Sequence, residues 1–356
     1  MTSLEVRLGP RSYPIHVGSG LLESLDDFVG KIFHKGRCAI ITDSNVGPLY
    51  AKKITTALAS FDPTVLTVPA GEKSKSLGCV EELCGQLIAA GFDRSSFVVA
   101  LGGGVVGDLA GFAAAIYFRG IPCVQIPTTI IAQVDSAIGG KTGVNAVAGK
   151  NLIGAFHQPR TVIADVDTLR TLPAREFNEG FAEVIKHAII RDAEMFDALA
   201  HFDRANLEAL IARNAAIKAT IVSADEHERT GERALLNFGH TVGHAIENAA
   251  GYGRFLHGEA IALGLMAATN LSVRHAGLPE ESRDRILARL AQFELPTRLP
   301  PEIDTEKIMA TLRVDKKFAA GQVRFVLTSG IGSAFVSDDV SLDQIRSAVN
   351  GLRSAT

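Results

Sequence analysis

Short apolar runs rich in β-branched residues alternate with segments of helical period along the first half of the chain. Four runs have the pattern of buried strands: 37–43, 64–70, 95–101 and 122–128. Segments 47–60 and 76–91 lie between them and predict helices. Strands that alternate with helices indicate parallel β-α-β units. The first half is therefore predicted to be an α/β domain.

The pattern changes near Pro173. Helical periodicity then dominates, from 176–190 through the histidine-containing stretch 237–259 to 279–294. We therefore expect an α/β domain over 1–172 and a mostly helical domain over 173–356.

Composition limits the function classes. The 356 residues are 47% hydrophobic and 21% charged, with 34 glycines, which is typical of a globular α/β enzyme. A net charge of −3 gives no basic field for nucleic acid or a membrane surface. The N-terminus has no apolar signal core, the apolar runs are too short to span a membrane, and the four cysteines form no CxxC pair. We expect a soluble, cytoplasmic protein.

A glycine-rich segment follows the third predicted strand. Gly102, Gly104 and Gly107 match G-x-G-x-x-G between a strand and a helix, where glycines let the backbone approach a pyrophosphate. No acidic residue ends the next strand, so Asp43, at the end of an earlier strand, is the better ribose candidate. A tight strand-to-helix turn without a ligand remains an equal alternative.

A second glycine-rich segment, 139–143, resembles the end of a phosphate-binding P-loop. Asp135 stands where that motif requires its first glycine, which argues against an ATPase. Lys141, Lys150 and Asn151 still form a compact set of donors, although loop lysines are often only solvated.

Three histidines lie close together in the helical half. His240 and His244 share one helix face at i and i+4, and His257 follows in a glycine-flanked turn. Helices present metal ligands at this spacing, but packed histidines would show it too, and His-Glu-x-x-His is absent. Glu183, on an otherwise apolar helix face, is a further ligand candidate; the alternative is a surface pair with Lys186.

Together these segments resemble the 3-dehydroquinate synthase family, from about Asp43 to the DKK at 315–317. The motifs that carry the resemblance are GEKSK (71–75), GGGVVGDLAGF (102–112), YFRG (117–120), QIPTTIIAQVDSAIGGKTGVN (125–145), GKNLIGAFHQP (149–159), GFAEVIKH (180–187), LNFGHTVGHAIE (236–247) and LHGEAIALG (256–264).

The resemblance implies a Rossmann-like NAD-binding domain, a mainly α-helical metal- and substrate-binding domain, and a homodimer. It also implies a divalent metal, zinc or cobalt, bound by Glu183, His240 and His257. His244 is then left to the substrate, as a group that moves protons. This splits the pair that spacing alone nominates as joint ligands.

The same motifs imply two further sets of residues. The NAD set is Asp43, Asn45, Glu72, Lys75, Gly103, Gly104, Val105, Asp108, Thr128, Thr129, Lys141 and Lys150. The substrate set is Arg119, Asp135, Lys141, Asn151, Lys186, Lys218, Arg233, Asn237, His244 and one of Lys316 or Lys317. We expect Arg119 to reach across the dimer.

The implied reaction converts 3-deoxy-D-arabino-heptulosonate 7-phosphate, a phosphorylated sugar acid, into 3-dehydroquinate and phosphate, with NAD recycled. Other sugar phosphate cyclases share the scaffold, but Lys218, Asn237 and His244 favour the shikimate-pathway substrate. A polyol dehydrogenase of the glycerol dehydrogenase type is a second alternative. A non-catalytic nucleotide-binding regulator is a remote third.

Overall fold

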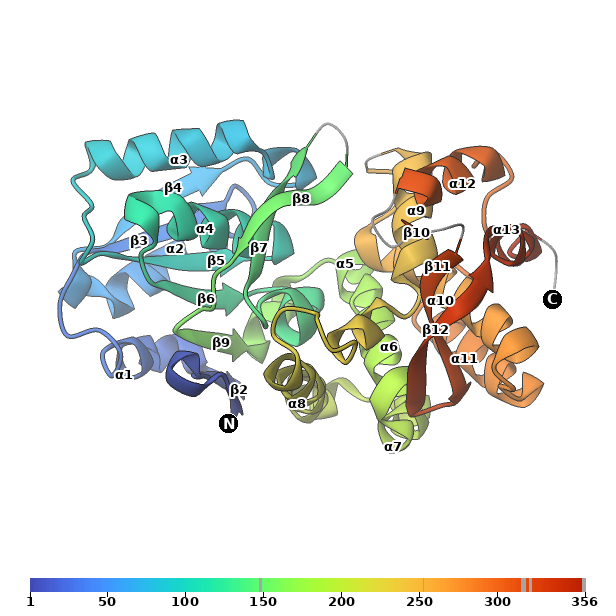
Figure 1. Ribbon diagram of the computed structural model, residues 1–356. Coiled ribbons are helices and arrows are strands. Elements are labelled where there is room, and N and C mark those ends of the chain that lie inside the picture. Colours follow the sequence, from blue (N-terminus) through green and yellow to red (C-terminus); the bar gives the residue numbers. More distant parts are fainter. Residues whose placement is uncertain (147–148, 252, 315–317, 320–321, 354–356) are drawn as a thin grey trace. The chain divides into compact units, whose positions relative to one another are not determined.

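The computed structural model describes residues 1–146, 149–251, 253–314, 318–319 and 322–353 (Figure 1). The chain divides into two compact units. The first comprises Met1–Leu172 and Ala205–Ser223, and the second comprises Pro173–Arg204 and Ala224–Thr356. Helix α8 (Leu207–Ala224) therefore belongs almost entirely to the first unit. The assignment of 1–172 to NAD and 173–356 to metal and substrate stays a prediction.

A seven-stranded sheet forms the centre of the first unit. Its order is β1-β2-β9-β6-β5-β3-β4. The strands are β1 (Thr2–Val6), β2 (Tyr13–Gly18), β3 (Cys38–Asp43), β4 (Thr64–Val68), β5 (Phe97–Gly102), β6 (Cys123–Pro127) and β9 (Thr161–Asp165). All neighbours are parallel except β1 and β2. The predicted parallel sheet and its four strands are confirmed, but only β3, β5 and β6 are buried throughout, because β4 lies at the edge of the sheet. The strands β1, β2 and β9 were not predicted.

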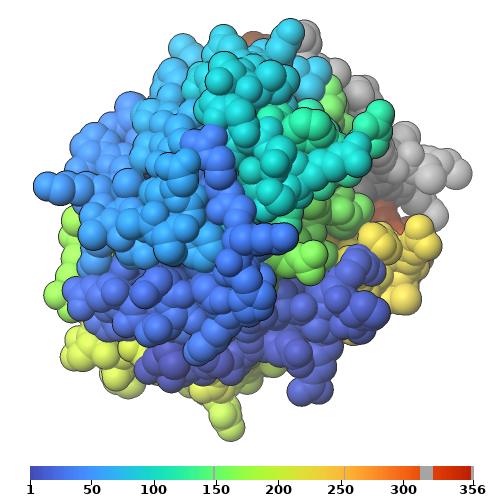
Figure 2. Space-filling view, turned by 90° about the vertical axis from the view of Figure 1, so that its left-hand side faces the viewer, coloured from blue at the N-terminus to red at the C-terminus, as the bar shows by residue number. Residues whose placement is uncertain are grey.

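Helices cover both faces of this sheet. On one face, α3 (Leu77–Ala89) and α4 (Gly104–Ile116) pack against side chains such as Ile41 and Val98. On the other, α1 (Leu25–Val29) and α2 (Gly47–Ala57) pack against the alternate positions of the same strands. Burial on both faces explains the continuous apolar strands. Figure 2 views this unit from one side, where N-terminal segments, blue to cyan, cover most of the surface.

A hairpin lies against α4 in the same unit. Strands β7 (Lys141–Ala146) and β8 (Gly149–Phe156) pair antiparallel in a sheet of their own, and a π-helical segment, η6 (Ala132–Ser136), precedes them. The glycines before Lys141 therefore lead into a strand. A P-loop would lead into a helix, so the argument against an ATPase is supported.

The second unit is mostly helical. Its helices are α5 (Ala174–Glu179), α6 (Phe181–Arg191), α7 (Ala193–Ala198), α9 (His240–Ala250), α10 (His257–His275), α11 (Glu280–Gln292), α12 (Thr305–Val314) and α13 (Leu342–Gly351). An antiparallel sheet of β10 (Phe318–Ala319), β11 (Gln322–Gly330) and β12 (Ser333–Ser341) accompanies them and was not predicted. The expected helical character is confirmed. The described helices include none long and apolar enough to cross a membrane.

Short 3₁₀ helices connect these elements. They are η1 (Gly9–Arg11), η2 (Leu21–Ser24), η3 (Ala59–Phe61), η4 (Glu72–Ser74), η5 (Tyr117–Arg119), η7 (Val166–Thr171), η8 (Leu199–His201), η9 (Arg204–Asn206) and η10 (Arg233–Asn237). Three of them, η4, η5 and η10, contain candidate site residues.

Candidate metal and nucleotide sites

Helix α6 buries a charged pair in the second unit. Every residue from Phe181 to Ile190 is buried, including Glu183 at 0% exposure and Lys186 at 1%. The Lys186 ammonium forms an ion pair with the Glu183 carboxylate. The alternative of a surface pair is therefore wrong. A buried carboxylate is costly unless it is paired or binds a cation, so this one needs a partner beyond packing.

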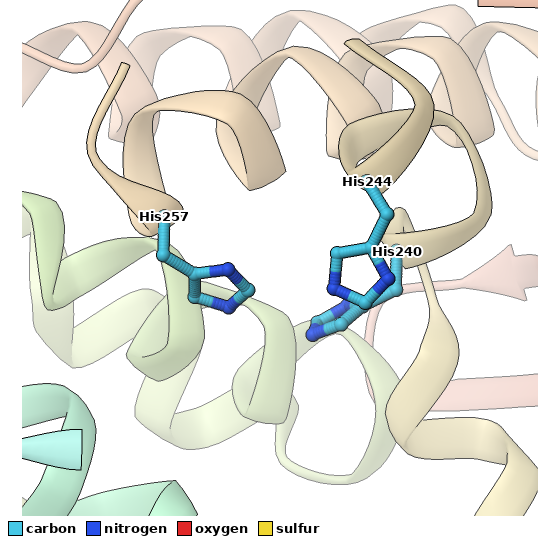
Figure 3. Close-up of side chains that lie close together, drawn as sticks. All are labelled: His240, His244 and His257. Atoms are coloured by element: carbon cyan, nitrogen blue, oxygen red, sulfur yellow. The ribbon is translucent and has the colours of Figure 1, made fainter. Parts of the chain in front are cut away.

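Two histidines supply further partners for Glu183. Its Oε1 lies 3.3 Å from Nε2 of His240, the first residue of α9, and 3.3 Å from Nε2 of His257, the first residue of α10. Figure 3 shows the rings of His240, His244 and His257 approaching one another from two helices. The candidate ligand atoms of these histidines lie within 4.8 Å of one another.

The three rings differ in exposure. His240 is buried and His257 partly buried, whereas His244, one turn along α9 from His240, is exposed. Ring centroids are 5.2 Å apart for His240 and His244, and 5.7 Å for His244 and His257. The structure therefore brings the implied ligands Glu183, His240 and His257 together and leaves His244 at their accessible side.

The electrostatics of the cluster favour a cation. Burial opposes ionisation of Glu183, but Lys186 and His240 outweigh it and hold the pKa of the carboxyl well below its usual range. Burial and the Lys186 charge lower the pKa of His240. Burial also disfavours a charged His257, yet Glu183 and Glu247 raise its pKa to about 10. The two carboxylates therefore stabilise positive charge on His257.

The burial and hydrogen bonding of the Glu183 carboxylate also suit a divalent metal. Within the described residues, both of its oxygens are buried and neither makes a hydrogen bond of good geometry. One carboxylate oxygen and two imidazole nitrogens that face one another form a donor set that zinc and cobalt accept. The residues present fit the implied metal.

Two carboxylates lie close to His257 and the residue after it. Glu247 of α9 is buried, and its Oε2 lies 3.8 Å from Nδ1 of His257, on the side of the ring away from Glu183. Glu179 of α5 accepts a hydrogen bond of 2.9 Å from the backbone N–H of Gly258. Sequence reasoning missed both. Glu247 had a detectable signal, because it lies at i+7 from His240 on the same helix face.

Glycines let the two histidine-bearing helices approach closely. A Cβ on Gly264 of α10 would lie 2.0 Å from the Gly239 carbonyl oxygen and 2.6 Å from the Gly243 nitrogen. Gly239, the N-cap residue just before α9, has a left-handed φ of 78°. The spacing of α9 and α10, and hence of His240 and His257, depends on these glycines.

The segment before α9 places two more predicted residues. Asp225 accepts backbone hydrogen bonds from Arg229, Thr230, Gly231 and Arg233, and these bonds fold the loop into a compact turn. Arg233 is buried, and the Asn237 amide donates to Glu228 at 2.8 Å. Lys316 and Lys317 lie outside the described residues.

In the first unit, the glycine motif lies where β5 ends and α4 begins. A Cβ at Gly103 would be 3.0 Å from the Thr129 side chain, and one at Gly104 would be 3.0 Å from Ser136. Helix α4 has no acidic residue in its first turn and no side-chain cap, so its N–H groups suit an anion. The close protein contacts at Gly103 and Gly104 also suit a tight strand-to-helix turn, so the pyrophosphate role of this turn stays a prediction.

Charged side chains surround the start of α4. Lys75 forms a buried ion pair with Asp108. Burial raises the pKa of Asp108, and Lys75 opposes that shift. Glu72 accepts a hydrogen bond of 2.8 Å from Asn145 and lies 3.5 Å from Lys150 Nζ. Asp43 receives the backbone N–H groups of its own turn, including that of Asn45 at 2.8 Å.

Of the substrate residues expected in the first unit, two are joined by a hydrogen bond and three are described individually. Lys218 donates to Asp135 at 2.7 Å. Lys141, at the start of β7, and Arg119, at the end of η5, are exposed. Arg119 and Asn151 both have left-handed backbones, with φ of 69° and 55°. Residues other than glycine rarely adopt this backbone conformation, so the surroundings hold both turns in place.

Comparison with known proteins decides the family. Residues 65–179 match the family model "3-dehydroquinate synthase N-terminal", and residues 180–318 match "3-dehydroquinate synthase C-terminal". The 3-dehydroquinate synthase of Acidithiobacillus ferrooxidans is 49% identical over 349 residues, which are 96% of this chain and 95% of that protein. The chain belongs to the 3-dehydroquinate synthase family.

Solved structures of related cyclases support this family assignment. A 2-deoxy-scyllo-inosose synthase in complex with carbaglucose-6-phosphate, NAD+ and Co2+ superposes with a TM-score of 0.88 at 29% identity, covering 98% of this chain and 99% of that one. The 2-epi-5-epi-valiolone synthase of Streptomyces hygroscopicus subsp. jinggangensis 5008, with NAD+ and Zn2+ bound, gives 0.86 at 31% identity and covers 96% of each chain. The 3-dehydroquinate synthase fold is therefore present along nearly the whole chain.

Proposed function

We propose that this chain is a 3-dehydroquinate synthase, which converts 3-deoxy-D-arabino-heptulosonate 7-phosphate into 3-dehydroquinate and phosphate with recycled NAD and a divalent metal. The observation that carries the proposal is Glu183 with two imidazole nitrogens at 3.3 Å, in a chain 49% identical to a 3-dehydroquinate synthase along nearly its whole length.

In the second unit, Glu183, His240 and His257 would hold the metal. When bound, a divalent metal supplies Lewis-acid polarisation of a substrate oxygen. Lys186 balances the buried Glu183 charge, and we assign it the further role of a donor to the anionic substrate. His244, exposed beside the ligands, can accept or return the proton of a substrate hydroxyl.

In the first unit, the turn at Gly103 and Gly104 would receive the pyrophosphate of NAD, and Asp43 would accept hydrogen bonds from its ribose. Glu72, Lys75 and Asp108 would border the nucleotide. When bound, NAD supplies a hydride acceptor that is regenerated within the same turnover. The chain's contribution is to fix the orientation of the dinucleotide through backbone N–H groups and charged side chains.

Basic and amide groups would recognise the two anionic ends of the substrate. Lys141, Asn151 and Lys218 of the first unit supply charge-assisted or neutral donors. In the second unit, Arg233 supplies a guanidinium group and Asn237 supplies a side-chain amide. A phosphate and a carboxylate need such a set, whereas a neutral polyol does not. This argues against a glycerol dehydrogenase-like activity.

Two finer assignments belong to the same proposal. Lys218, Asn237 and His244 favour the heptulosonate phosphate over the substrates of other sugar phosphate cyclases. We also infer a homodimer in which Arg119 of one protomer reaches the substrate site of its partner. The exposed position of Arg119 and its strained turn support this role.

Phosphate release tests the function. The purified protein, given the heptulosonate phosphate, NAD and Zn2+ or Co2+, should release phosphate and form dehydroquinate in equal amounts. Treatment with a chelator should abolish both, and added metal should restore them. If the metal-loaded protein with NAD releases no phosphate from this substrate, the proposed function is wrong.

A further inference from the structure

The hairpin of the first unit contains an irregularity at the residues expected to touch NAD and substrate. Val144 pairs with Ile153 and Ala146 pairs with Gly149, so Asn145 alone stands opposite residues 150–152. Such a bulge leaves backbone groups without ladder partners and redirects side chains. Lys150 and Asn151, both expected ligand residues, lie in it.

The side chain of Asn145 closes this bulge. Its Oδ1 accepts the backbone N–H of Asn151 at 3.0 Å, which replaces the missing ladder bond and holds Asn151 at a φ of 55°. Asparagine adopts this left-handed conformation more readily than most residues, and the hydrogen bond from Asn145 adds a tertiary constraint on the turn.

The nitrogen of the same Asn145 amide contacts the segment expected to bind NAD. Nδ2 of Asn145 donates to Glu72 Oε1 at 2.8 Å, and that oxygen lies 3.5 Å from Lys150 Nζ. The backbone N–H of Asn145 donates to the Lys75 carbonyl at 2.9 Å. One residue therefore joins the Glu72–Lys75 segment to the bulge by three hydrogen bonds.

From this arrangement we infer that Asn145 is a positioning residue that sets the NAD-facing Glu72 and the substrate-facing Asn151 in one fixed geometry. The inference rests on the proposed function for the ligands that Glu72 and Asn151 face. It assigns Asn145 no contact with either ligand. Loss of Asn145 therefore weakens binding on both sides of the hairpin at once.

Truncation gives the first test. Asn145→Ala should raise the Kd for NAD, measured by calorimetry, and the KM for the heptulosonate phosphate by about tenfold each, the scale of one lost hydrogen bond to a charged group. Its kcat should change far less. Amide hydrogen exchange at Asn151 should accelerate. The matched control is Leu152→Ala, which removes an exposed side chain from the same strand and should leave the Kd and KM unchanged.

An exchange of partners gives the second test. Asn145→Asp keeps the acceptor for Asn151 but sets a carboxylate against Glu72, so NAD binding should weaken. In a Glu72→Gln background, the amide at position 72 can donate a hydrogen bond to the carboxylate at position 145. Asn145→Asp should then reduce NAD affinity several-fold less than it does in the wild-type background.

Three results separate the possible failures. Unchanged Kd, KM and amide exchange in Asn145→Ala would overturn the inference, as would an equal effect of Asn145→Asp in both backgrounds. If Asn145→Ala does not fold, the comparison of Asn145→Asp with and without Glu72→Gln tests the inference by itself. If the wild-type protein binds NAD but releases no phosphate, the proposed function fails, while NAD binding and amide exchange still test the role of Asn145.

Discussion

Gly264→Ala tests whether the close crossing of α9 and α10 sets the metal-ligand geometry. The added Cβ would lie 2.0 Å from the Gly239 carbonyl oxygen, and real Cβ contacts essentially never fall below 3.0 Å, so the backbones must separate by at least 1.0 Å. Overpacking of this kind costs about 1–3 kcal/mol. Since metal-ligand bonds tolerate only about 0.2 Å, the same shift should misplace His240 against His257.

Metal titration and thermal unfolding measure these two effects separately. We expect the Tm of Gly264→Ala to fall by roughly 2–4 °C per kcal/mol lost, and the affinity for Zn2+ or Co2+, from chelator competition, to fall by more than about tenfold. Gly351→Ala is the control in the same unit, because a Cβ on Gly351 meets nothing within 4 Å. Wild-type Tm and metal affinity in Gly264→Ala would refute this account of the helix crossing.

The remaining predictions concern single side chains. His257→Ala should lose bound metal and activity together, whereas His244→Ala should retain metal, measured by elemental analysis, and turn over slowly; loss of metal from His244→Ala would show that the ligand assignment is wrong. Glu247→Gln should weaken metal binding by about ten- to a hundredfold, because neutralising the carboxylate behind His257 loosens the ring; an unchanged Kd for metal would contradict this. Backbone hydrogen bonds outweigh burial and lower the pKa of Asp225 from 3.8 to about 2, so its stabilisation is present above pH 3.8 and lost as the pH falls towards 2. Asp225→Asn should therefore show a smaller drop in Tm across that acid range than the wild type, and equal drops would argue against the loop assignment.

The sequence predicted the parts of the fold that follow from local periodicity. Continuous apolar runs predicted β3, β5 and β6 because strands covered on both faces leave no polar alternation, whereas the edge strand β4 alternates exposed and buried residues. The strands β11 and β12 pair with each other across a short connection, so the sequence held a local hairpin signal that was missed. Domain membership of α8 is a different case, since only contacts in three dimensions assign it to the first unit.

The candidate site shows the same division between local and distant information. Helical spacing put His240 and His244 on one face, but it could not choose which of them approaches Glu183. That choice depends on how α9 packs relative to α6, which carries Glu183, and only the three-dimensional structure gives this packing. The burial of Lys186 beside Glu183 likewise depends on what surrounds α6, which no local pattern encodes.

In the proposed reaction, NAD is recycled within each turnover while phosphate is released. The most direct test mixes the metal-loaded protein with excess heptulosonate phosphate and NAD at a concentration far below that of the substrate. We predict many phosphate molecules released per NAD, with dehydroquinate formed in equal amount and no net NADH. Phosphate release that stops at one per NAD, or steady accumulation of NADH without phosphate release, would contradict the assignment.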